Sequence, residues 1–238
     1  MKLKKVLVAW LALLPFSISY ADNQATNVEP ILPTAGWQQL FNGHDLDKWG
    51  FVGLGDFAIK DNALMSRGKM GVMWYKPEKF GNCVVRVVFK VSHPETSAAV
   101  FVLMPNAPTD VWDAVNHGYQ IKIADHTDGY HRTGSVYSLS SARDGLTKPA
   151  GEWNTMDIFL EDQAITVYIN GQFATHYTPT QSVPPKQASS EPDRGNPMAA
   201  TGYIGVQNHN DLINEMVGQV WFKEISVLPL QSDTQSTS

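Results

Sequence analysis

The chain has 238 residues, of which 43% are hydrophobic, and a formal net charge of −5. The excess of acidic residues argues against nucleic acid as a partner, because phosphates require a basic surface, and against adsorption to anionic lipid. A single cysteine, Cys83, excludes an internal disulfide bond, and its place in an alternating apolar segment predicts a buried core residue.

The first 21 residues have the pattern of a cleavable signal peptide. A basic start precedes an apolar run over 6–18, and the small side chains of Ser19 and Ala21 predict cleavage after Ala21. A membrane anchor is the weaker interpretation, since the run is shorter than the roughly 20 residues that span a bilayer. We therefore expect a periplasmic or secreted protein with no membrane span in its mature form. Removal of three lysines would shift its formal charge from −5 to −8.

The rest of the chain consists of short apolar runs, many of them alternating with polar residues, separated by turn residues. We expect a flexible leader over 22–35, one domain over 36–230 and a disordered tail over 231–238. Hairpin turns are predicted at Asp61-Asn62 and, most strongly, at Asn170-Gly171. The expected strands are 37–41, 57–60, 63–66, 83–91, 97–104, 118–124, 134–139, 155–160, 164–169, 172–177, 203–208 and 221–228.

About a dozen short strands without a long amphipathic helix predict an all-β fold, a jelly-roll sandwich of two packed antiparallel sheets. In such a fold one sheet often curves, and its concave face can hold a ligand. The proline-rich segment 178–200 interrupts the strand rhythm. Its length predicts either a functional lid or a disordered loop.

Two of the predicted strands carry polar side chains on one face and apolar side chains on the other. Gln207 and His209 share such a face near the C-terminus, Gln120 and Lys122 share another in the middle of the chain, and Asp125 follows the second strand. If the two strands lie close together, amides and charged groups converge, as the hydroxyl groups of a saccharide require. The alternative is a solvated sheet face that binds no ligand.

The segment that follows the second of these strands is rich in histidine and acids. His126 and His131, with Asp125 or Asp128, offer donor atoms for a metal ion. The spacing matches no zinc template, so a solvated loop rich in turn residues is the favoured interpretation. Arg132 is a candidate for holding an anionic or carbonyl oxygen.

Aromatic residues supply a third group of candidates. Trp112 and Tyr130 fall in segments that resemble loops, and with Tyr137 they are candidates for stacking on a sugar ring. The sequence lacks the nucleophile elbow, the phosphate loop, the dinucleotide fingerprint and the His-Glu-x-x-His motif. It also lacks a strand of closely alternating acids, so hydrolysis by two carboxylates is not expected.

Six motifs follow one another in order: WQQLFNGHDLDKW over 37–49, GYQIKIAD over 118–125, TGSVY over 133–137, PAGEWN over 149–154, ING over 169–171 and GVQNH over 205–209. Together they resemble the 3-keto-glycoside 1,2-lyase and 3-keto-2-hydroxy-glucal hydratase family, also called 3-keto-disaccharide hydrolases. The resemblance covers roughly residues 36–230. It implies a concanavalin A-like jelly roll, in agreement with the strand pattern.

The resemblance also implies a carbohydrate substrate that already carries a ketone at C3, so that its C2 proton is acidic. A base removes this proton, the enolate expels the C1 substituent, and addition of water gives the free 3-keto-sugar. His209 is the candidate base. Lys122 or Arg132 would stabilise the enolate, and Gln207 and Asp125 would orient hydroxyl groups. A divalent metal is compatible with this chemistry, although the sequence shows no certain cofactor.

The central strand departs from the family pattern at two positions. Gln120 stands where family members carry an acid, and Lys122 stands where they carry an amide. Lys122 would then supply the positive charge that a metal ion could otherwise provide. The alternative function is a glycan-binding jelly-roll module with a degenerate site, and a structural or partner-binding envelope protein is a third interpretation.

Overall fold

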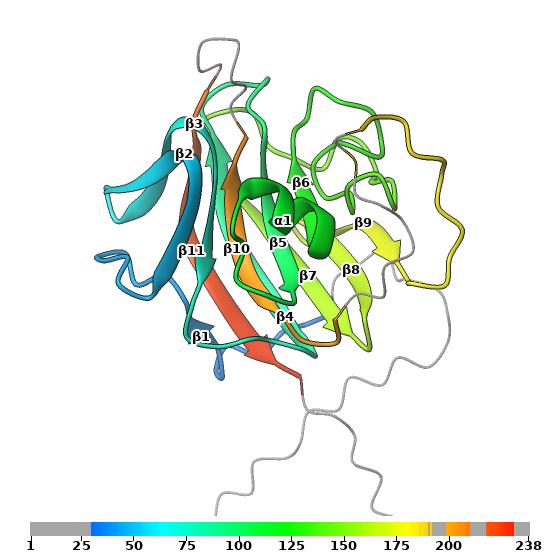
Figure 1. Ribbon diagram of the computed structural model, residues 1–238, viewed down its shortest axis with the longest axis horizontal. Coiled ribbons are helices and arrows are strands. Elements are labelled where there is room, and N and C mark those ends of the chain that lie inside the picture. The colour runs from blue at the N-terminus through cyan, green and yellow to red at the C-terminus, as the bar shows by residue number, and fades with distance from the viewer. Residues whose placement is uncertain (1–29, 190, 192–198, 210–217, 231–238) are drawn as a thin grey trace, which may run out of the picture.

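The computed structural model describes residues 30–189, 191, 199–209 and 218–230. The predicted signal peptide 1–21, most of the predicted leader and the predicted tail 231–238 lie outside these residues. Within the described part of the chain, eleven strands form one curled antiparallel sheet with a short helix against it (Figure 1). No helix in that part is long and apolar enough to cross a membrane.

Most of the strands begin and end close to where the alternation of the sequence predicts them. The elements are β1 (Gln38–Gln39), β2 (Trp49–Lys60), β3 (Ala63–Tyr75), β4 (Cys83–Val91), β5 (Ala98–Met104), α1 (Val111–His117), β6 (Tyr119–Ile123), β7 (Asn154–Glu161), β8 (Ala164–Ile169), β9 (Gln172–Tyr177), β10 (Tyr203–Asn208) and β11 (Val220–Pro229).

Hydrogen bonding runs through the strands in the order β6-β5-β10-β3-β11-β4-β7-β8-β9, with β1 paired to β11 and β2 to β3. Strand β3 joins the two layers of the jelly roll. Its residues Leu64 and Met65 pair with β11, whereas 71–74 pair with β10. The two predicted sheets are therefore a front layer, β6-β5-β10, and a back layer, β11-β4-β7-β8-β9, which are hydrogen-bonded to each other through β3.

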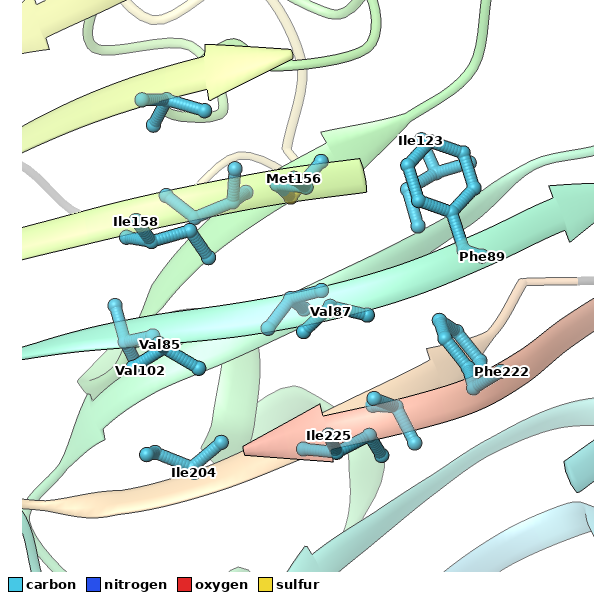
Figure 2. Packing of buried hydrophobic residues seen from close by; sticks show 14 of the residues in the cluster. Val85, Val87, Phe89, Val102, Ile123, Met156, Ile158, Ile204, Phe222 and Ile225 are labelled. Atoms are coloured by element: carbon cyan, nitrogen blue, oxygen red, sulfur yellow. The ribbon is translucent and has the colours of Figure 1, made fainter. Parts of the chain in front are cut away.

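The core lies between these two layers. Val85, Val87 and Phe89 of β4 project into it at every second residue, as strand geometry requires (Figure 2). Cys83 begins β4 on the same face, and burial raises the pKa of its thiol to about 12, which fits the predicted structural role. Residues of other strands complete this part of the core, among them Met156, Ile158, Val102, Ile123 and Ile204.

The core determines which side chains of the front layer face outward. Ile121 and Ile123 of β6 point into it, as do Ile204 and Val206 of β10. Side chains on successive strand residues point to opposite faces, so the alternate residues of both strands lie on the outer face of the front layer. This face holds the polar residues that the sequence analysis singles out.

Helix α1 covers one end of this outer face, and the sequence analysis missed it. Asp110 caps the helix by accepting hydrogen bonds from the backbone N–H groups of Trp112 and Asp113. An acid before a short apolar run is a helix-start signal, but seven residues are too few to show a helical period. The helix packs through Ala114 and Val115 on a cluster that includes Val72, Phe101 and Met104.

Two other predictions were wrong in detail. The hairpin of β2 and β3 is much longer than the predicted strands 57–60 and 63–66. Its outer part contains several glycines, which are typical of loops in a sequence, but here they lie within the strands, where the two backbones approach closely. A Cβ on Gly55 would lie 1.6 Å from the carbonyl oxygen of Lys69. Segment 134–139 is not a regular strand, since its Val136 forms only isolated bridges, one to Ile121 of β6 and one to Ser140.

Candidate functional site

Strand β5 lies between β10 and β6, so residues of the three strands form rows across the outer face of the front layer. In one row Gln207 is opposite Ala99, and Ala99 is opposite Lys122. In the neighbouring row Phe101 is opposite Gln120. One small alanine thus separates the two polar strands, and longer side chains can meet above it.

Gln120 and Gln207 do meet there. The Nε2 atom of Gln120 donates a hydrogen bond to Oε1 of Gln207 at 2.7 Å, and both side chains are buried. The Nε2 atom of Gln207 has no partner in the described part of the chain. Because an unsatisfied buried donor costs about 1–3 kcal/mol, a ligand oxygen that accepts from this atom would gain binding energy.

Lys122 is the one lysine that is buried among the described residues, with 5% of its surface exposed. Its Nζ donates to Oγ of Ser97 at 3.2 Å and lies 5.5 Å from the centre of the Tyr137 ring. No carboxylate of the described residues forms an ion pair with it. Burial lowers the pKa of this ammonium group to about 8.

The charge on Lys122 is therefore expensive to bury and lacks a negative partner within the described structure. Such a group binds an anion or a carbonyl oxygen favourably, because the ligand supplies the missing partner in a medium of low dielectric constant. Ser97 and Tyr137, which contact the amine, are each partly exposed. The amine thus lies beneath a rim that solvent reaches.

His209 lies on this rim. Its backbone N–H donates to the carbonyl oxygen of Ser97 at 3.2 Å, which extends the pairing of β10 with β5 by one residue. Its side chain is partly exposed. The structure therefore places the predicted base next to the residue that binds the Lys122 amine.

Two predicted site residues are directed elsewhere. Nη1 of Arg132 forms an ion pair with Asp144 at 3.0 Å, and its Nη2 donates to the backbone of Thr127. Asp125 accepts a hydrogen bond from Oγ1 of Thr147 at 2.6 Å. No described hydrogen bond or ion pair connects either residue to the amine, so Lys122 is the better candidate of the two cations named for enolate stabilisation.

The structure places the three aromatic candidates in different surroundings. Tyr137 belongs to the site, because its backbone N–H donates to the carbonyl oxygen of Gln120 at 2.8 Å and its ring lies beside Lys122. Trp112 is 45% exposed, but it lies on helix α1 rather than in the expected loop. Tyr130 contacts the site only indirectly, since its carbonyl oxygen accepts from the backbone of Ser138.

Behind Tyr137 lies a contact that the sequence analysis did not predict. The His131 ring packs edge-on against Tyr137, with 5.2 Å between the ring centres. Its Nδ1 lies 2.8 Å from Oδ2 of Asp128, and its Nε2 lies 3.5 Å from Oε1 of Glu191, which is buried. No pattern marks Glu191 or Ser97 in the sequence, because their positions depend on how distant segments pack.

The metal-binding interpretation of this histidine-rich segment finds no support in the geometry. Among the described residues, no three His, Cys, Asp or Glu side chains are grouped so as to hold a metal ion. The groups around Lys122 are amides, a hydroxyl and an ammonium, which do not match the carboxylate and imidazole ligands of divalent cations. The described residues around Lys122 therefore do not fit a divalent cation.

The other end of the same face is closed. A Cβ on Gly205 would lie 2.7 Å from the carbonyl oxygen of Met73 and 3.1 Å from Cε of Met104, so this glycine is covered. Tyr203 packs against the cluster under α1, and its ring lies 5.2 Å from Nζ of Lys79. The candidate site is thus the polar end of the face, formed by Gln120, Lys122, Gln207, Ser97, Tyr137 and His209.

Solved structures share this fold. A crystal structure from Parabacteroides distasonis, named as a "Putative glycosyl hydrolase", has a TM-score of 0.64 at 24% identity, covering 82% of this chain and 99% of that one. A protein of unknown function with a galectin-like fold, from Bacillus subtilis, has a TM-score of 0.52 at 14% identity, covering 81% and 94%. The exoplasmic/lumenal domain of VIP36, in a form bound to Ca²⁺ and Man3GlcNAc, has a TM-score of 0.54 at 13% identity, covering 87% and 93%.

At these identities the likeness establishes the fold alone, and it confirms the predicted jelly roll. Among curated proteins, none matches the sequence. A family model described as a 3-keto-alpha-glucoside-1,2-lyase-like domain matches residues 36–228, which is most of the chain and nearly the whole described sheet. Its description points to a carbohydrate-related function. On this match the chain belongs to the family of 3-keto-alpha-glucoside-1,2-lyase-like domains.

Proposed function

We propose that this protein cleaves glycosides that carry a ketone at C3, by removing the C2 proton, eliminating the C1 substituent and adding water. The observation that carries the proposal is the buried amine of Lys122, which has no carboxylate partner in the described structure. Family membership supports the class of substrate. The geometry supports the chemistry, because a positive group at the ketone stabilises the enolate that such an elimination forms.

Each residue of the site has a role in this reaction. Lys122 supplies a positive charge at C3, which stabilises the electron pair left behind when the C2 proton is removed, and this stabilisation strengthens as the negative charge develops. His209, on the partly exposed rim, takes the C2 proton, since an imidazole is a competent base near neutral pH. The free Nε2 atom of Gln207 donates to a sugar hydroxyl. No pair of catalytic carboxylates is needed.

A glycan-binding module without turnover is the second candidate. The observation that favours it is the composition of the site, whose described polar groups around the amine are amides and hydroxyls rather than acids. The VIP36 domain, whose structure was solved with Man3GlcNAc bound, has the same fold. Binding of an unoxidised glycan without cleavage of any 3-keto-glycoside would favour this alternative.

Turnover should depend on the C3 ketone of the substrate and on Lys122. The protein should release the aglycone from an aryl 3-keto-glucoside but not from the matching unoxidised glucoside, whose C2 proton is not acidic. Replacing Lys122 by Met should slow release by ~10²–10³-fold, the usual cost of losing one donor to a developing oxyanion. Lys76→Met, at an exposed lysine, should leave the rate unchanged.

Aglycone absorbance measured for α- and β-linked substrates, with and without a chelator, checks this prediction. Equal cleavage of the oxidised and unoxidised glucosides would contradict it, as would full activity of Lys122→Met. Loss of activity with the chelator would show that the reaction requires a metal ion.

The buried Lys122 should make the stability of the folded protein depend on pH. The pKa of Lys122 is about 8 in the folded protein and near 10.5 when unfolded. The unfolded chain therefore binds more protons between these values, and folding becomes more favourable as the pH rises from about 8 to 10.5. Relative to Lys122→Met, the wild type should gain about 3 kcal/mol of unfolding free energy across this range.

Denaturant unfolding of both proteins at pH 7.5 and 10.5 measures this gain. Lys76→Met, which removes an exposed amine, should show no such change relative to the wild type. A constant difference between wild type and Lys122→Met at the two pH values would show that the amine is not buried as described.

We also propose that the protein is exported. Residues 1–21 have the pattern of a cleavable signal peptide, which would deliver the enzyme to the periplasm or the medium. N-terminal sequencing of the protein purified from the producing cells should begin at Asp22. A sequence that begins at Met1 or Lys2 in the active fraction would contradict export by cleavage.

A further inference from the structure

The proposed function leaves open how Lys122 activates the ketone. As an ammonium ion the side chain donates a hydrogen bond to the C3 oxygen. As a neutral amine it is a nucleophile that attacks the carbonyl carbon. The two possibilities differ in whether a covalent bond joins protein and substrate, and the surroundings of the amine distinguish between them.

We propose that Lys122 condenses with the substrate ketone to form an iminium ion, and that the C2 proton is lost from this covalent intermediate. The inference rests on the proposed function and deepens it. Its geometric basis is a buried amine whose described contacts are one hydroxyl and one aromatic ring, at Ser97 and Tyr137. A carboxylate partner would hold the amine in its protonated, unreactive form, and none is present among the described residues.

The acidity of the group agrees with this basis. At the lowered pKa of about 8, roughly one-tenth of the amine is unprotonated at pH 7, whereas an ordinary lysine at 10.5 is almost entirely charged. Burial is the cause of the shift, and desolvation is a known way to activate a lysine for imine formation. The described structure offers no other lysine that is buried.

The backbone that carries the amine is held on both sides. The backbone N–H of Lys122 donates to the carbonyl oxygen of Ser135 at 3.1 Å, and its carbonyl oxygen accepts from Gly134 at 2.9 Å. Both edges of β6 are therefore paired, with β5 on one side and this segment on the other. The start of the side chain is therefore fixed, and the hydrogen bond from Nζ to Ser97 limits the positions that the amine can take.

Neighbouring groups can handle the protons. Oγ of Ser97, 3.2 Å from Nζ, is placed to pass a proton to the C3 oxygen as it leaves. His209 lies beside Ser97 on the rim and would take the C2 proton. The unpartnered Nε2 atom of Gln207 would donate to an oxygen of the sugar.

The steps balance without a redox partner. The neutral amine adds to C3, and the C3 oxygen takes one proton from the nitrogen and one from solvent through Ser97 and leaves as water, which gives the iminium ion. Loss of the C2 proton gives an enamine, which expels the C1 oxygen as the protonated aglycone. One water molecule then attacks C3 of the conjugated iminium ion, which releases the unsaturated ketone, restores the neutral amine and returns to solvent the proton taken up in the first step. The water lost in the first step equals the water used in the last.

Reductive trapping tests the proposal. Full-length protein is mixed with 3-keto-1,5-anhydroglucitol, a ketone with no leaving group at C1, and reduced with borohydride. Intact mass should increase by the mass of the ligand less one oxygen atom. Peptide mapping should place the adduct on Lys122, at least ~10-fold above the exposed Lys76, because a larger fraction of the buried amine is unprotonated. Unoxidised 1,5-anhydroglucitol should give no adduct.

Lys122→Arg is the matched variant, since it keeps the positive charge but has no nucleophilic amine. It should give no adduct and should lose turnover of an aryl 3-keto-glucoside by ~10²-fold or more, the scale of one lost transition-state contact. Turnover by the wild type without trapping at Lys122 would overturn the covalent inference and leave the proposed function standing.

The covalent inference can also hold when the proposed elimination is wrong. Trapping at Lys122 without release of any aglycone would support the covalent inference and contradict the elimination. If neither an adduct nor aglycone release is found in the wild type, both proposals are wrong. The wild-type mapping does not depend on whether the variant folds.

Discussion

The alternation of apolar and polar side chains on β6 and β10 is the constraint on which both the core and the site depend. Ile121 and Ile204 are held inside because their burial stabilises the packing of the two layers. The same geometry obliges Lys122 and Gln207 to face outward on the front layer. A shift of one residue in either register would reverse this arrangement, so the site cannot move without loss of the core.

The site is costly in the free protein. Lys122 carries a charge that burial disfavours, and Gln207 carries a donor that nothing described satisfies. A core spread over both layers, including Val87 and Phe222, can offset that cost. Local departures from polar satisfaction are expected at functional sites, and a ligand with a carbonyl oxygen and several hydroxyl groups would relieve both.

The fold was largely predictable, because strand periodicity is a local signal. Strands β4, β8, β9 and β10 have the bounds that alternation and turn residues indicate. The residues that were missed depend on tertiary contacts instead. Gly55 and its neighbours lower the strand propensity of β2, yet close approach of the backbones requires glycine there.

The site was predictable only where its residues lie on strands. Register brings Gln120, Lys122 and Gln207 onto one face, as their place in the alternation suggested. For loop residues the sequence does not predict where the side chain points. Arg132, a candidate for enolate stabilisation, forms an ion pair with Asp144. Loop side chains follow whichever partner the packing provides, and a sequence pattern does not identify that partner.

The central claim is that the C2 proton leaves before the glycosidic bond is replaced. Cleavage of a 3-keto-glucoside in deuterium oxide tests it most directly, with the product quenched at low conversion and 3-keto-glucose incubated in parallel to measure spontaneous exchange. Elimination followed by addition of water predicts one deuterium at C2 of the newly formed 3-keto-glucose. Retention of the original proton at C2, with normal release of the aglycone, would contradict the account.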